Sequence, residues 1–132
     1  MKYLLLGIFL LALLVGSGLL VLWQTSRALD ETEAPLRAME APLRESDYET
    51  MLALTEESRA VWEEHHGFFC SFFSHADLED VDQSYASLFA YAEKEELAEF
   101  RDAFRRLCDL LDHLRRMDVP YYYNILAILC HR

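Results

Sequence analysis

Three histidines in the middle of the sequence come nearest, by residue type and spacing, to a metal site. His65, His66 and His75 stand beside several carboxylates, among them Asp77. Imidazole nitrogens and carboxylate oxygens are common ligands of zinc, iron and manganese. Adjacent residues of a helix point about 100° apart, so only one of His65 and His66 can join His75. This interpretation makes His66, His75 and Asp77 the candidate metal ligands.

The competing interpretation gives the same histidines a structural role. His66 then lines the packed face of a helix, and His75 hydrogen-bonds at a helix start. The segment HHGFF also lacks the HExxH arrangement, in which two histidines one turn apart hold the ion. We favour this interpretation and predict no metal site and no cofactor. A metal-binding or small-ligand-binding helical domain built on His66, His75 and nearby carboxylates is the alternative function.

Paired carboxylates, which can act as general acid and base, recur along the chain. The pairs Glu56-Glu57 and Glu63-Glu64 are examples. Catalytic carboxylates need burial or a close partner to shift their pKa, whereas these pairs adjoin polar helix faces, where we expect them to be solvated. The sequence contains no Ser-His-Asp order, glycine-rich phosphate loop or nucleophile elbow. We therefore predict that the protein is not an enzyme.

Aromatic residues are crowded into two short segments. The candidate interaction patch consists of Phe68, Phe69, Phe72, Phe73, Tyr121 and Tyr122. One helix face cannot bury so many rings, so some of them must pack on other helices, on a partner protein or at the membrane surface. We favour core packing, with a recognition patch or a bilayer contact as the alternative.

The charge of the chain disfavours nucleic acid as a partner. Lys2 is the only charged residue among the first 26, so 11 of the 12 basic residues and all 23 acidic residues follow it. A nucleic-acid-binding protein clusters lysine and arginine to displace counterions. Here the adjacent pairs Arg105-Arg106 and Arg115-Arg116 stand among aspartates. We expect solvated helix faces of mixed charge.

The three cysteines are Cys70, Cys108 and Cys130, and none has CxxC spacing. An odd number excludes a fully paired intrachain framework. Each stands in an apolar stretch, where a free thiol behaves as a small hydrophobic group. We expect buried free thiols, with one disulfide as the alternative if the domain faces an oxidising compartment.

The chain begins with an apolar segment from Tyr3 to Trp23 that contains no charged side chain. A helix of this length, at 1.5 Å per residue, reaches roughly 30 Å, which is the thickness of the hydrocarbon core of a bilayer. Trp23 and the polar residues after it are typical of a membrane interface. Residues 1–26 are therefore predicted to be a transmembrane anchor, with the lipid bilayer as a partner.

Cleavage and orientation of this segment each have an alternative. Small residues at Gly16 and Gly18 fit a signal-peptide cleavage site, but the apolar run continues to Trp23, so we favour an uncleaved anchor. Positive residues differ little between the two flanks. From the short N-terminal tail and the acidic remainder we predict a single-pass cell-membrane protein, with the N-terminus cytoplasmic and the helical domain extracytoplasmic. The spacing of Ala12 and Gly16 would permit a homo-oligomer.

A leucine repeat predicts a helical stem over residues 27–45. Leu22, Leu29, Leu36 and Leu43 recur every seven residues, as in a coiled coil. The prolines of the doubled APLR element each remove a backbone donor, so we expect the stem to be kinked or interrupted.

Residues 46–132 have the pattern of a helical bundle. Ser46 and Ser74 each begin a capping-box sequence, Gly67 weakens a helix interior, and the apolar stripe changes phase at Lys94. Pro120 is predicted to end the last long helix and to start a short terminal one. The predicted fold is all-α, with an N-terminal transmembrane helix followed by the stem and a small antiparallel helical bundle.

The order of these features resembles an uncharacterised family, domain of unknown function 4363, whose members are short membrane-anchored helical proteins of spore-forming Gram-positive bacteria. The likeness is carried by the anchor, a helix containing Trp62, the segment SHADLEDVDQSYASLFAY, a leucine-rich helix ending LLDHL and a terminal NIL. It covers nearly the whole chain, but the doubled APLR and the FFCSFF segment depart from it. The resemblance implies a location in the cell envelope and no known activity. Our leading hypothesis is a non-enzymatic, membrane-tethered module that binds another protein of the envelope.

Overall fold

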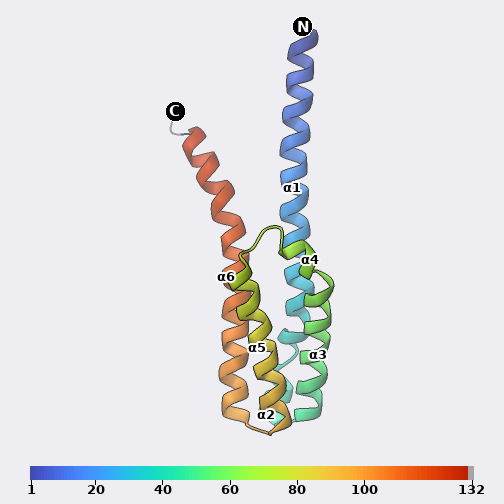
Figure 1. The fold of residues 1–132 in the computed structure, drawn as a ribbon, viewed down its shortest axis with the longest axis vertical. Helices are drawn as coiled ribbons and strands as arrows, with labels where there is room; N and C mark the ends of the chain where they lie inside the picture. Colours follow the sequence, from blue (N-terminus) through green and yellow to red (C-terminus); the bar gives the residue numbers. More distant parts are fainter. Residues whose placement is uncertain (131–132) are drawn as a thin grey trace.

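The computed structural model describes the backbone of residues 1–130 and side chains as far as Met117, and all its regular elements are helices (Figure 1). No strand occurs within residues 1–130, so the all-α prediction is confirmed. The elements are α1 (Lys2–Arg37), α2 (Glu40–Glu45), α3 (Tyr48–Glu64), α4 (His66–Phe69), α5 (His75–Glu93) and α6 (Leu97–Cys130).

Four of these helices enclose one apolar core. The second half of α1 packs on α3, α3 on α5, α5 on α6, and α6 on α1, which closes the ring. Successive long helices run in opposite directions (Figure 1). The largest side chains that are fully buried between them are Trp62, Tyr85, Phe69, Phe100, Leu29, Met39 and Met51. Their burial removes apolar surface from water, which stabilises the packed arrangement.

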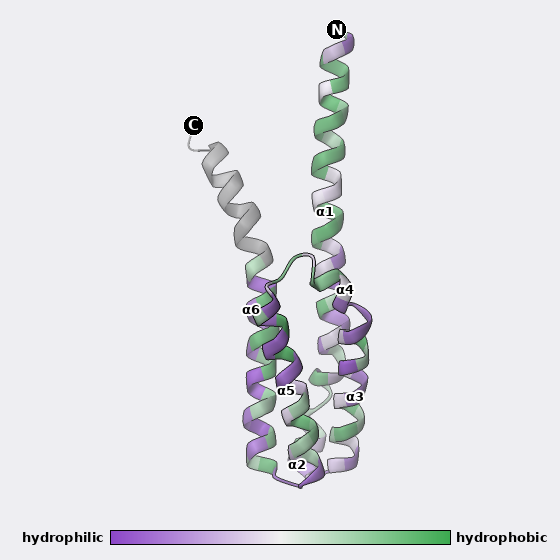
Figure 2. Cartoon of the chain, viewed as in Figure 1, coloured by the Kyte–Doolittle hydropathy of each residue, from purple (hydrophilic) through white to green (hydrophobic). Residues whose placement is uncertain are grey.

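The first helix passes from an uncovered segment into this core without a break. Its N-terminal half projects out of the bundle and is apolar on all sides (Figure 2). It is the one helix of the described residues that is long and apolar enough to cross a membrane, and a signal sequence near an N-terminus would pass the same test. Burial begins at Thr25 and continues along one stripe of the helix.

The predicted stem contributes directly to the bundle core. Leu29 and Leu36 of the leucine repeat are buried, and Leu43 packs against the same cluster. Residues 27–45 thus supply one wall of the bundle. The sequence analysis had treated them as a stem separate from the bundle. The predicted interruption is present, because α1 ends at Arg37, two residues after its proline, and α2 begins at Glu40.

The two predicted capping boxes have different outcomes. The Ser74 hydroxyl accepts a hydrogen bond from the Asp77 backbone N–H at 3.2 Å and caps α5, as predicted. Ser46 was expected to cap α3, and this was wrong. Ser46 has a φ of 54° and ends α2 in the left-handed region, so the chain is not extended there, and Asp47 caps α3 by accepting from the Thr50 N–H at 3.2 Å.

The helical path is interrupted two residues before Gly67, the residue expected to weaken a helix interior. Helix α3 ends at Glu64, His65 interrupts the helical path, and Gly67 lies inside the short α4. The phase change predicted at Lys94 is a turn between α5 and α6, in which Glu95 takes a φ of 57°. The Tyr48 hydroxyl donates to the Glu95 carbonyl at 3.0 Å and holds this turn without glycine or proline.

The prediction that the last long helix ends at Pro120 was wrong. Helix α6 continues from Leu97 to Cys130 as one element. One proline removes one hydrogen bond from a helix, and the helix can continue when the flanking residues keep helical dihedral angles. The C-terminal part of α6 consequently reaches the end of the bundle at which α1 enters, because the two helices are antiparallel (Figure 1).

Candidate functional site

The structure does not bring the candidate metal ligands together. His75 is exposed at the first position of α5, and the Asp77 carboxylate accepts a hydrogen bond from the Ser74 hydroxyl at 2.6 Å. His66 instead faces Asp82, with 3.7 Å between its Nε2 and the carboxylate Oδ2. Within the residues whose side chains are described, no three histidine, cysteine or carboxylate side chains form a group that could hold a metal ion.

Asp82 and His66 both contact the indole of the buried Trp62. The Trp62 indole N–H donates to Asp82 at 2.8 Å, and the His66 ring meets the indole edge to face at 6.4 Å. Asp82 thereby satisfies the polar group of the largest buried side chain, which would otherwise lack a partner. His66 itself lies at the edge of the core, with its side chain 39% exposed.

A buried polar network links α1, α3 and α5, and sequence analysis did not identify it. The Ser58 hydroxyl donates to the Thr32 carbonyl at 2.7 Å. Because that donation uses its only hydrogen, the Tyr85 hydroxyl must donate to Ser58, at 2.7 Å. Burial raises the pKa of Tyr85 far above its ordinary value, so the phenol stays neutral. The network specifies helix packing and provides no acid or base at neutral pH.

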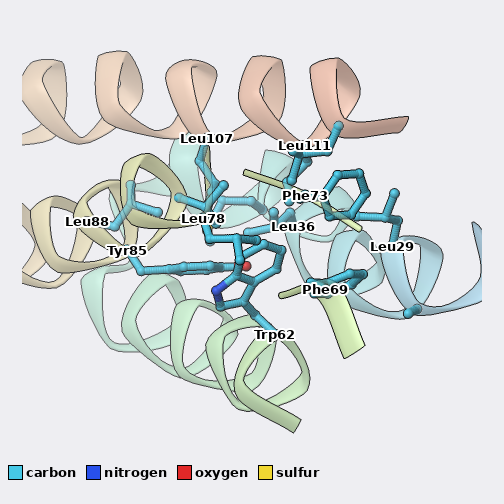
Figure 3. Close-up of a cluster of buried hydrophobic side chains, with 14 of the residues drawn as sticks. Leu29, Leu36, Trp62, Phe69, Phe73, Leu78, Tyr85, Leu88, Leu107 and Leu111 are labelled. Carbon is cyan, nitrogen blue, oxygen red and sulfur yellow. The ribbon is translucent and has the colours of Figure 1, made fainter. Parts of the chain in front are cut away.

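The candidate aromatic patch divides between the core and the surface. Phe69 is fully buried and stacks on Trp62 with ring centroids 4.8 Å apart (Figure 3). Phe73 is buried as well. Phe68 is half-buried and Phe72 is 47% exposed, and their ring centroids are 5.0 Å apart. The other two members of the predicted patch, Tyr121 and Tyr122, lie outside the residues whose side chains are described.

A groove lies between α1, α2 and α6. Its hollow is about 450 Å³. The apolar lining comes from Leu36, Leu43, Phe104 and Cys108, and the charged lining from Glu33, Arg37, Glu40 and Asp112. Burial, with Glu33 and Asp109 nearby, raises the pKa of the Cys108 thiol to about 11. The thiol is thus protonated at neutral pH and acts as part of the apolar floor.

The groove continues along α2 toward the α5–α6 turn, and its charge changes on the way. The neighbouring hollow of about 300 Å³ shares three lining residues with the first: Glu40, Leu43 and Phe104. Its remaining lining residues are Arg44, Arg101 and Arg105. We call the joined hollows the α2 groove. It has a continuous apolar floor, with carboxylates predominant at one end and guanidinium groups at the other.

An ion-pair cluster and a hydrogen bond link α6 to the α1–α2 side of the groove. Arg115 of α6 reaches Asp30 at 2.7 Å and Glu33 at 3.1 Å on α1. Desolvation alone would lower the pKa of Arg115, but these two carboxylates outweigh it and raise the pKa above the ordinary value. At the other end, the Arg101 side chain donates to the Leu43 carbonyl at 3.1 Å. Both contacts hold α6 against the α1–α2 side.

Comparison of the chain with protein-family models, curated proteins and solved structures finds no match.

Sequence analysis missed the α2 groove because its two walls are far apart in the sequence. Glu40 and Leu43 precede Phe104 and Arg105 by some sixty residues. The doubled APLR element and the Arg105-Arg106 pair were each visible, and the latter was interpreted as a solvated face. Only the packing of α2 near α6 joins them.

Proposed function

We propose that the protein is a membrane-tethered, non-enzymatic interaction module whose helical bundle binds a segment of another protein in the α2 groove. The observation that carries the membrane tether is the uncovered apolar half of α1. Large side chains from Leu4 to Leu20 are more than half exposed, Leu6, Leu11 and Leu14 among them. Water would make such a surface unfavourable, at roughly 25 cal/mol per Å², and a bilayer removes that cost.

The anchor is proposed to be single-pass, with the N-terminus in the cytoplasm and the bundle outside. The acidic bundle and the single Lys2 before the apolar segment support this orientation. The resemblance to domain of unknown function 4363 also implies the cell envelope. Protease added to intact protoplasts is expected to digest the bundle. Full protection of the bundle, with digestion only after lysis, would reverse the orientation.

The α2 groove suits a short amphipathic segment of a partner protein. Its apolar floor can take the apolar side of a helix, and apolar contact supplies most of the affinity in this recognition mode. The two charged ends favour one direction of binding, with basic residues of the partner near Glu33 and Asp112 and acidic residues near Arg101 and Arg105. The groove is shallow and polar-rimmed, as expected for a protein contact and not for an enclosed small-molecule site.

Site-specific photocrosslinking in the native membrane tests the groove. A crosslinker at Phe104 is expected to give one adduct of defined mass, and the same group at Glu57, which is exposed on α3, is expected to give none. The adduct should weaken several-fold in Asp112→Lys, which reverses a charge of the groove.

Asp109→Lys is the matched control for this experiment. Asp109 is exposed on the same helix, one turn away, and does not line the groove. It should leave the adduct unchanged. Equal adduct yields from Phe104 and Glu57, or equal losses in the two lysine variants, would contradict a specific site in the α2 groove.

A further inference from the structure

The end of the bundle at which α1 enters carries an aromatic pair, of which Phe72 is exposed and Phe68 is half-buried. Phe68 and Phe72 lie on α4 and on the turn after it, with ring centroids 5.0 Å apart. Phe72 is 47% exposed, and no other phenylalanine of the bundle's described side chains is comparably exposed. Their neighbours Phe69 and Phe73 are buried and attach this segment to the core. The Phe68–Phe72 pair is therefore held against the core by its buried neighbours.

Contacts place this segment beside the exit of α1 from the bundle. His65, just before α4, has its Nε2 3.3 Å from the Glu31 carboxylate of α1. The chain then continues toward the N-terminal half of α1 (Figure 1). Leu29, Phe69 and Phe73 lie together at the same end of the core (Figure 3).

The α1 residues at this level have the character of a membrane interface. Trp23 is 58% exposed, and the Arg27 guanidinium lies 5.4 Å from the centre of its ring. Tryptophan and arginine are enriched where a helix leaves lipid for water. Their separation along the helix axis is about 6 Å, at 1.5 Å per residue. The bilayer surface is thus expected within a turn or two of the α4 segment.

Helix α6 brings further apolar sequence to the same end. It has 34 residues, whereas the adjacent antiparallel α5 has 19. The excess length extends past the start of α5, on the side toward which α1 projects (Figure 1). Within this excess, the sequence from Val119 to Cys130 contains no charged residue and includes three consecutive tyrosines. Tyrosine is also enriched at membrane interfaces.

We infer that this end of the bundle rests on the lipid surface, with Phe68 and Phe72 inserted among the headgroups as a second membrane contact. This inference rests on the proposed anchoring by α1. The contact is apolar and not charge-driven, because the chain carries a formal charge of −11 and anionic lipids would repel it. It therefore persists in zwitterionic membranes and changes little with salt.

Depth-dependent fluorescence quenching on the full chain tests the contact. Cys70 is exposed between the two phenylalanines in sequence and can carry a fluorophore after Cys108→Ser and Cys130→Ser. In phosphatidylcholine vesicles containing nitroxide lipid, the label at Cys70 is expected to be strongly quenched. Phe72→Ser is expected to reduce that quenching at least twofold, at both low and high salt.

Two controls separate a local contact from a general effect. A label at Lys94→Cys, in a chain without the native thiols, lies at the opposite end of the bundle and is expected to remain unquenched. Phe89→Ser removes a half-buried ring far along α5 from its start and should leave quenching at Cys70 unchanged. Helical circular dichroism and a melting curve for each variant verify that the fold is retained.

Tryptophan quenching by brominated lipid distinguishes failure of this inference from failure of the anchor. Trp62 is fully buried, so quenching reports on Trp23. If Trp23 is quenched and the Cys70 label is not, the lipid contact of the bundle is refuted while the anchor stands. If neither responds, the proposed anchoring fails as well. Equal quenching in Phe72→Ser and in the parent chain would refute the role of that ring.

Discussion

The two halves of α1 belong to one uninterrupted helix but differ in how apolar residues are distributed around it. From Tyr3 to Trp23 the helix is apolar on every side, and none of its side chains is fully buried. From Thr25 to Leu36 only a stripe is apolar, and that stripe is buried against α3 and α6. A helix that is apolar all round requires an apolar environment on all sides, whereas a stripe requires one packed neighbour surface. Continuity of a helix therefore says nothing about the uniformity of its surroundings.

Charging the N-terminal half should have the largest effect on the protein. Leu10→Arg combined with Leu14→Arg places two charges near the middle of the apolar segment, at a cost of about 2.5–3.5 kcal/mol each on the insertion scale. We expect the chain to move from the membrane fraction to the soluble fraction. The melting temperature of the bundle should stay the same, since these side chains touch no core residue. Membrane fractionation with carbonate extraction measures the first effect.

Shortening a buried side chain in the second half of α1 should have the opposite effect, lowering the stability of the bundle without changing membrane association. Leu29 is fully buried beside Phe69 and Phe73, so Leu29→Ala should reduce the free energy of unfolding by about 2–5 kcal/mol. Membrane association should be unaffected. Chemical denaturation of the detergent-solubilised chain measures the loss, and Leu13→Ala, in the uncovered half, serves as the control. Equal losses in these two variants would contradict the distinction between the halves.

Removal of the hydroxyl at Ser58 tests the polar link between α1 and the bundle. Ser58→Ala leaves the Thr32 carbonyl and the Tyr85 hydroxyl without their partner in the core. We expect a loss of about 1–3 kcal/mol, the cost of unsatisfied buried groups. The double variant Ser58→Ala, Tyr85→Phe should recover part of this loss, because it removes the buried donor. A double variant that is less stable by the full sum would exclude coupling between the two residues.

The α3 cap should give the smallest effect, and one that depends on pH. Hydrogen bonds from the Thr50 side chain and backbone lower the pKa of Asp47 below its ordinary value of 3.8. Since the folded pKa is the lower one, the stabilisation is present above about pH 4 and disappears as the pH falls through the folded pKa. Asp47→Ala should melt at a lower temperature than the parent near neutral pH, and the difference should shrink below pH 4. A difference that is constant with pH would exclude ionisation of Asp47 as its cause.

Sequence patterns predicted local features well and long-range contacts poorly. The phase change at Lys94 located a turn, and Ser74 was identified as a cap, because both depend on neighbours within one or two turns. The predicted α3 cap, Ser46, was wrong by one residue. Either Ser46 or Asp47 can cap a helix, and only the position at which α2 ends decides between them. The predicted helix end at Pro120 was wrong because one missing hydrogen bond does not by itself end a helix.

The aromatic residues show the same limit at the candidate sites. Periodicity indicated that Phe68, Phe69, Phe72 and Phe73 could not all be buried by one face, and the structure divides them into a buried pair and a more exposed pair. It did not indicate which pair, because that choice depends on Trp62 and Leu29 of other helices. The α2 groove likewise requires α2 and α6 to meet, and no local pattern encodes that meeting.

The unbroken passage of α1 from the apolar segment into the core has a mechanical consequence. Neither glycine nor proline occurs between Leu19 and Ala34, so no swivel separates the two parts of the helix. In the proposed membrane-anchored state, rotation of the N-terminal segment about the helix axis would therefore rotate the bundle by a similar angle, together with the direction in which the α2 groove opens. Other proteins in the same membrane would then approach the groove from one fixed direction.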